Sequence, residues 1–142
     1  MGLRFEVTTD TAKIDFDAVY RFLNAESSWA EGIPRDLFDR AMRNALCFAS
    51  LLAGEQIAFA RVITDCATFA NLVDVFVVPE YRGNGYATRL LEQVFAHPDL
   101  VGLRRFTLAT SDKHGLYEKF GFHAPLRPDT LMERYDPDIY KK

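Results

Sequence analysis

The sequence has few of the residues that build metal centres, disulfide scaffolds or nucleophilic sites. Its 142 residues include two cysteines and three histidines. Cys47 and Cys66 stand singly in apolar or strand-like surroundings, so we expect two buried thiols rather than a disulfide or a nucleophile. The histidines are scattered without ligand spacing, so we expect no metal. This use of cysteine is typical of a reducing cytoplasm.

The chain also has no excess of positive charge and no long apolar run. The net charge is −3, so no cationic field favours nucleic acid or anionic lipid, and we expect neither a nucleic-acid nor a membrane partner. No segment approaches the length of a membrane span. The opening stretch MGLRFEVTTD contains no apolar core of a signal peptide. These absences favour a cytoplasmic location.

The chain does contain enough apolar residues for one substantial core. Hydrophobic residues make up 49% of it and charged residues 26%, which is typical of a globular protein. A length of 142 residues fits one domain, and no repeat, linker or low-complexity segment divides it. We therefore expect a single domain over residues 1–142.

Hydrophobic periodicity predicts the element order β-α-α-β-β-β-α-β-α-β. The expected strands are 3–8, 46–53, 55–64, 69–78, 104–110 and 130–135, and the expected helices are 16–25, 35–45, 86–96 and 114–120. Asp15 is a plausible cap of the first helix, and Pro34 can open the second. Helices between late strands require parallel crossovers, whereas hairpins require antiparallel pairs. The expected fold is an α/β domain with a mixed, mostly antiparallel sheet and helices on both faces.

The stretch VPEYRGNGYATRL, residues 78–90, concentrates small residues at the start of a predicted helix. A Walker loop would need a terminal Gly-Lys-Ser/Thr, and a dinucleotide fingerprint would need a third glycine where Thr88 stands. Both fail, and a plain tight turn stays open. The alternative is an anion cradle, because Gly83 and Gly85 let a phosphate approach the free N–H groups at the helix start. Arg82 could add a charge-assisted contact, and Arg89 is a weaker candidate.

Two motifs together resemble the GNAT superfamily of acyl-CoA-dependent N-acetyltransferases. VDVFVVPEYRGNGYATRLL resembles motif A, with Arg82, Gly85 and Ala87 at the motif positions. GLYEKFGF, residues 115–122, resembles the Tyr-x-x-x-Gly-Phe signature of the same family. Both occur in the expected order, and the element order fits that fold across nearly the whole chain. One departure is Thr110, which stands where the family often has an asparagine.

The resemblance implies acetyl-CoA as co-substrate, with no metal, and assigns roles to residues of this chain. The cofactor-binding positions that it implies are Phe76, Val77, Val78, Arg82, Gly83, Asn84, Gly85, Tyr86, Ala87 and Thr88. It implies a strand that splays from its neighbour, whose free backbone groups pair with the pantetheine arm and face the thioester oxygen. Tyr117 would be the general acid for the leaving thiolate, although the residues alone favour packing of its ring beside Leu116 and Phe120. Asp74 is a weak candidate base, and a structural aspartate at a bulge is the other reading.

The acceptor is not readable from the sequence beyond its class. Glu26, Trp29 and Glu31 lie between the first two helices, where the family binds acceptors, and Trp29 could line a pocket or belong to the core. The expected activity is transfer of an acetyl group from acetyl-CoA to the primary amine of a small molecule or to an amino terminus. The alternative is a non-catalytic acyl-CoA-binding module or partner subunit. Members of the family often pair, so a homodimer is among the expected partners.

Overall fold

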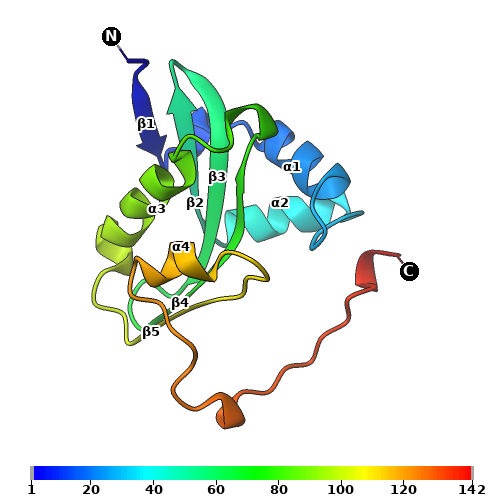
Figure 1. Ribbon diagram of the computed structural model, residues 1–142. Coiled ribbons are helices and arrows are strands. Elements are labelled where there is room, and N and C mark those ends of the chain that lie inside the picture. Colours follow the sequence, from blue (N-terminus) through cyan, green and yellow to red (C-terminus); the bar gives the residue numbers. More distant parts are fainter. Residues whose placement is uncertain (1, 142) are drawn as a thin grey trace.

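Five strands form one sheet whose order in space follows the order in the chain, as the computed structural model of residues 2–141 shows (Figure 1). The strands are β1 (Phe5–Thr8), β2 (Leu46–Leu52), β3 (Glu55–Thr64), β4 (Phe69–Val77) and β5 (Arg105–Leu108). The pairs β1–β2, β2–β3 and β3–β4 are antiparallel, and β4–β5 is parallel. This arrangement confirms the predicted mixed, mostly antiparallel sheet.

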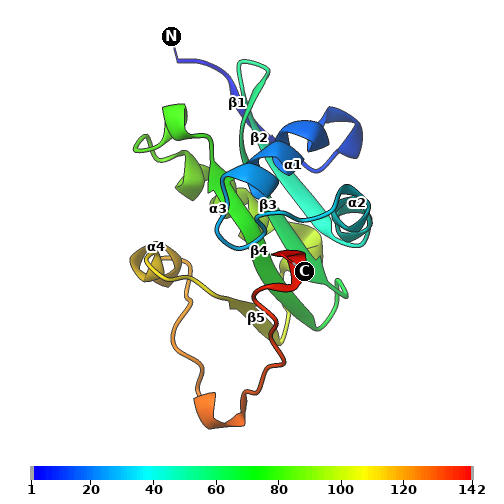
Figure 2. The ribbon, with the colours of Figure 1, turned by 90° about the vertical axis from the view of Figure 1, so that its right-hand side faces the viewer.

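Helices cover both faces of the sheet, as predicted (Figures 1 and 2). They are α1 (Phe16–Ala25), α2 (Arg35–Arg43), α3 (Tyr86–Ala96) and α4 (His114–Glu118). The buried residues of α1 and α2 pack with Phe59 and Phe76 on one face, and those of α3 pack with Tyr117 on the other. Asp15 caps α1 by accepting a hydrogen bond from the Ala18 amide at 3.0 Å, so the helix begins where the sequence indicated.

The central strand β4 is irregular at the point where the site will be found. The register between β3 and β4 shifts between Phe59 and Arg61, and Asp74 on the opposite strand has a φ of +55°. A left-handed conformation is strained for an aspartate, and it marks this β-bulge. On its other side, β4 pairs with β5 only as far as Leu72 and Leu108, although β4 continues to Val77.

The predicted sixth strand at 130–135 does not form. The chain leaves the body of the protein after Phe122 and runs as an arm that returns at Tyr140 (Figures 1 and 2). Leu131 has extended backbone angles, but this segment has no partner strand among the described residues. Thr130 instead ends a short 3-10 helix, Pro128–Thr130, and a strand also needs a neighbouring ladder, which is missing here because the arm lies away from the sheet.

The expectation of two buried thiols is wrong for one of the two cysteines. Cys47 is buried on β2, and its burial raises the pKa of the thiol to about 11. Cys66 is exposed, with a φ of +61°, in the turn between β3 and β4. That turn is organised by Asp65, whose Oδ1 accepts hydrogen bonds from the amides of residues 67, 68 and 69. Within residues 2–141, no helix combines the length and the apolar character needed to cross a bilayer.

Candidate functional site

The ladder between β4 and β5 ends at Leu72 and Leu108, and we call the stretch of β4 from 73 to 77, which has no partner strand on this side within residues 2–141, the opening. Val78 donates its N–H to the Ile57 carbonyl of β3 at 2.8 Å. Because backbone groups alternate in direction along a strand, the N–H and C=O of Val77 point away from β3, towards the side that β5 has left. The Val77 carbonyl indeed accepts a hydrogen bond from a side chain, Arg82, at 2.9 Å. The Val77 N–H is thus a donor at the wall of the opening.

The glycine turn after β4 has the geometry of an anion cradle. Gly83 and Gly85 have φ values of +80° and +79°, a conformation that favours glycine. Apart from the glycine and its chain neighbours, no described atom lies within 4 Å of where a Cβ of either glycine would stand, so the space in front of the turn is open. Gly85 is the N-cap of α3 and no side chain caps the helix, which leaves its first N–H groups for a ligand. Backbone donors and the helix dipole together favour a phosphate here.

The side chains around this turn are used mainly to hold its shape. Arg82 donates its Nε–H to the Val77 carbonyl, so only its two terminal nitrogens are left to bind a phosphate. Asn84 donates to the carbonyls of Tyr81 and Arg82, both at 3.1 Å. The Arg89 guanidinium lies over the Phe5 ring, 3.9 Å from its centre, and this cation–π contact engages the side chain that was the weaker candidate for a phosphate contact. The cradle is therefore chiefly a backbone structure.

Tyr117 lies on α4 and belongs to the same buried cluster as Val77. Its side chain is nearly buried, and burial raises the pKa of its hydroxyl above the usual value near 10. A raised pKa keeps the hydroxyl protonated throughout the neutral range. Thr110, at the position of the family's asparagine, accepts from the Lys113 amide at 3.0 Å and so closes the turn that leads into α4.

Asp74 is fully engaged by two side chains. Its Oδ1 accepts a hydrogen bond from the Trp29 indole at 2.7 Å, and its Oδ2 accepts one from Arg61 Nε at 2.6 Å. The Asp74 and Arg61 side chains are 6% and 16% exposed, so the ion pair is largely removed from water. Both carboxylate oxygens are occupied, and this geometry favours a positioning role for Asp74 over that of a base. Arg61 was missed in the sequence, where a lone arginine in an apolar strand could have indicated a partner for Asp74.

Trp29 connects the loop between α1 and α2 to the sheet through this bond. The residue is 52% exposed, so it belongs to the surface rather than to the core. Glu31 is exposed on the same loop. Neither residue lines the hollow described next, so of the three predicted acceptor residues the structure brings only Glu26 to it.

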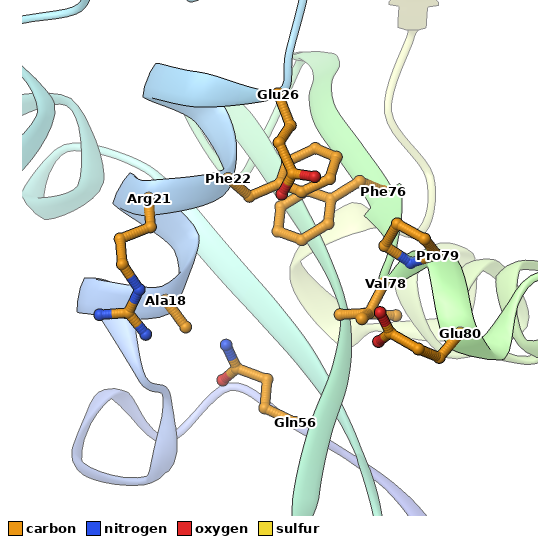
Figure 3. Close-up of a pocket in the computed structure, with 10 residues that line it drawn as sticks. Ala18, Arg21, Phe22, Glu26, Gln56, Phe76, Val78, Pro79 and Glu80 are labelled. Carbon is orange, nitrogen blue, oxygen red and sulfur yellow. The ribbon is translucent and has the colours of Figure 1, made fainter.

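A hollow of about 200 Å³ opens beside the end of β4 (Figure 3). It is lined by Ala18, Arg21, Phe22, Glu26, Gln56, Ala58, Phe76, Val78, Pro79 and Glu80. Phe22 and Phe76 stack at 3.9 Å between ring centres and form its floor. Glu26, from the end of α1, and Glu80, from the turn after β4, lie around it, as Figure 3 shows. Arg21 and Glu80 were not predicted, because only the fold brings these two segments together.

The hollow lies on one face of the end of β4, and the side chain of Val77 lies on the other. Along a strand, alternate residues face opposite sides, so Phe76 and Val78 line the hollow while Val77 belongs to the cluster with Tyr117. Two carboxylates beside one guanidinium give the hollow a negative balance, which suits a cationic group. Across residues 2–141, no three His, Cys, Asp or Glu side chains are grouped to hold a metal ion.

Comparisons with known proteins agree on one family. Residues 43–124 match the family model described as "Acetyltransferase (GNAT) domain". A Gibberella zeae protein, whose name provisionally assigns it to the acetyltransferases, is 33% identical over 135 residues, covering 80% of this chain and 75% of that protein. A crystal structure of a GNAT-family protein of Xanthomonas campestris pv. campestris is 51% identical, with a TM-score of 0.95 over 100% of both chains. An acetyltransferase of Clostridium acetobutylicum, solved with acetyl-CoA, has a TM-score of 0.66 at 17% identity, over 94% of this chain and 96% of the other.

Proposed function

Because the chain belongs to the GNAT acetyltransferase family, we propose that it transfers an acetyl group from acetyl-CoA to a primary amine. The observation that carries this proposal is the opening between β4 and β5, where the Val77 N–H lies free of β3 beside the glycine turn. A thioester carbonyl at Val77 and a pyrophosphate at residues 82–87 would place one extended ligand along the end of β4. The acceptor is a small molecule with a primary amine or an amino terminus.

The hydrogen-bond donors of the cradle suit the phosphate groups of acetyl-CoA. Backbone N–H groups at the start of α3 suit a pyrophosphate, whose charge the helix dipole also stabilises. On the side where a Cβ of either glycine would stand, no described atom beyond the chain neighbours obstructs it. Removing the N–H of an oxyanion site typically lowers kcat by about 10²–10³-fold, which is the scale of help expected from Val77.

The acceptor amine approaches from the hollow between α1 and β4. A lysine-like amine with a pKa near 10.4 is neutral only about 0.04% of the time at pH 7, a free-energy cost of roughly 4–5 kcal/mol. Glu26 and Glu80 attract the cationic form to the hollow, and the stacked rings of Phe22 and Phe76 favour its neutral form at the end of the path. The nitrogen attacks the carbonyl carbon and loses one proton to water.

Collapse of the tetrahedral intermediate breaks the carbon–sulfur bond. The thiolate then takes the hydroxyl proton of Tyr117, which solvent later restores. The raised pKa of Tyr117 means that it holds this proton at neutral pH, and transfer to a thiolate of pKa near 8.5 is uphill by roughly 2 kcal/mol or more. The hydroxyl therefore acts first as a hydrogen-bond donor and becomes an acid late in the reaction.

A panel of amines with acetyl-CoA, followed by free-thiol release, tests the proposal. The panel should contain polyamines, amino acids, aminoglycosides and peptides with free amino termini, and mass spectrometry should locate the acetyl group on nitrogen. The alternative, a non-catalytic acyl-CoA-binding module, predicts calorimetric binding of acetyl-CoA without thiol release for any acceptor. Failure to bind acetyl-CoA at all would refute both the acetyltransferase and the binding-module hypothesis.

A further inference from the structure

An aspartate occupies a left-handed position in β4, just before the residues at the end of the strand. Asp74 has a φ of +55°, a conformation that residues other than glycine rarely adopt. It belongs to the β-bulge, because Asp74 and Val75 together stand opposite Ala60, whereas the residues on either side pair one to one. In bulges with a left-handed residue, that residue is ordinarily glycine. The aspartate is thus held there at a cost in conformational energy.

The inserted residue decides which N–H groups of β4 face the opening. Without the bulge, the register that pairs Val62 with Leu72 would continue to the end of β4. Val77 would then stand opposite Ile57 and would donate its N–H to the Ile57 carbonyl. In the structure the extra residue passes this bond to Val78, which donates to Ile57 at 2.8 Å. The N–H of Val77 is left to the opening only because the bulge shifts the ladder by one residue.

Two side chains from separate parts of the chain hold the bulge residue. Arg61 lies on β3 opposite Val73, directly beside the bulge, and donates its Nε–H to Asp74 at 2.6 Å. Trp29, in the loop between α1 and α2, donates its indole N–H to the other carboxylate oxygen at 2.7 Å. The ion pair is largely buried, so little water competes for these bonds. The carboxylate is fixed from two directions, and the backbone of Asp74 is fixed with it.

We propose that Arg61 and Trp29 are positioning residues, which hold Asp74 in its left-handed conformation and so keep the Val77 N–H directed at the thioester oxygen. This inference rests on the proposed acetyl transfer, in which that N–H stabilises the oxyanion. Trp29 lies in the loop that begins after Glu26, a residue of the acceptor hollow. One carboxylate therefore ties the loop beside the acceptor hollow to the strand that carries the oxyanion donor.

Glycine and alanine at position 74 separate the backbone conformation from the side chain. Two double variants are compared, Arg61→Met with Asp74→Gly and Arg61→Met with Asp74→Ala, so that neither contains a buried charge without its partner. Glycine adopts a positive φ freely and should keep the bulge, whereas alanine is disfavoured there by roughly ten-fold. The kcat of the glycine variant should therefore be at least about ten-fold higher. The KM of the acceptor should rise in both variants, because both lack the bond to Trp29.

Amide hydrogen exchange followed by NMR tests the same point without any acetyl transfer. In the wild type and in the glycine variant, the Val78 amide should be protected and the Val77 amide should exchange quickly. In the alanine variant the protection should pass from Val78 to Val77, because the ladder slips by one residue. Ala53→Gly is the matched control: Ala53 has a φ of +51° in the turn between β2 and β3, and its replacement should change neither kcat nor the exchange of Val78.

Equal kcat and equal protection of Val78 in the two double variants would overturn the proposal, because the left-handed conformation would then have no effect on the donor. A wild type that acetylates no amine would instead refute the proposed function. The exchange of Val77 and Val78 would still decide, in that case, whether the conformation at position 74 sets the ladder.

Discussion

Replacing Tyr117 by phenylalanine separates a catalytic hydroxyl from an aromatic side chain that only packs. The ring is nearly buried among the residues of the α3 face and contacts Phe122 at 6.1 Å between ring centres. Phenylalanine keeps this packing. Loss of the hydroxyl should therefore change the free energy of unfolding by about 1 kcal/mol or less.

The effect on catalysis should be much larger than the effect on stability. If the hydroxyl donates to the departing thiolate, kcat should fall by about 10²–10³-fold, equivalent to roughly 2.7–4 kcal/mol. The affinity for acetyl-CoA should hold, because the cradle is made by residues 82–87. The raised pKa of Tyr117 also predicts that the wild type retains this donor as the pH rises, and loses it only above the usual tyrosine range near 10.

The assay is thiol release with the preferred acceptor, measured together with urea unfolding and calorimetric binding of acetyl-CoA. Acyl donors with better leaving groups should reduce the deficit of the variant, since their thiolates need less help from an acid. Tyr81→Phe is a matched control, because the Tyr81 hydroxyl is bonded to Glu55 at 2.7 Å on the surface. A folded Tyr117→Phe protein with wild-type kcat would refute the assignment and return Tyr117 to the core.

Three further variants address the rest of the site. Asp74→Asn leaves Arg61 without its buried counter-charge, so the free energy of unfolding should drop by about 3 kcal/mol in urea titrations; a loss of activity without any loss of stability would instead indicate that Asp74 is a base. Trp29 does not line the hollow itself, but Trp29→Phe removes the 2.7 Å bond that holds the loop following Glu26 to Asp74. It should therefore raise the KM of the acceptor more than that of acetyl-CoA, and equal changes in steady-state kinetics would point to general packing. Gly85→Ala and its control Gly54→Ala both force alanine to a φ near +80°, and each should cost about 1 kcal/mol of stability. Only Gly85→Ala should weaken calorimetric binding of acetyl-CoA, and equal affinity in the two variants would exclude the cradle.

Local patterns in the sequence were sufficient for most of the fold. β3 at 55–64 and α3 at 86–96 begin and end where their periodicity indicated, because apolar periodicity, the glycines before α3 and Pro98 after it act within a few residues. The same holds for the glycine turn, since φ values near +80° at Gly83 and Gly85 are a property of the chain at those positions. The order of hairpins and helices then restricted the sheet to a mixed one.

Contacts between distant segments were beyond local patterns, because the energy of a polar or apolar group depends on what surrounds it. The sequence by itself determined the elements up to α4, the glycine turn at 82–87 and the resemblance that named Tyr117. Only the tertiary structure decided that Asp74 is held by Trp29 and Arg61, which lie 45 and 13 residues away in the chain. It also brought Glu26 and Glu80 to one hollow, and it left residues 131–135 without a ladder, because a strand exists only where a second backbone is present to pair with it.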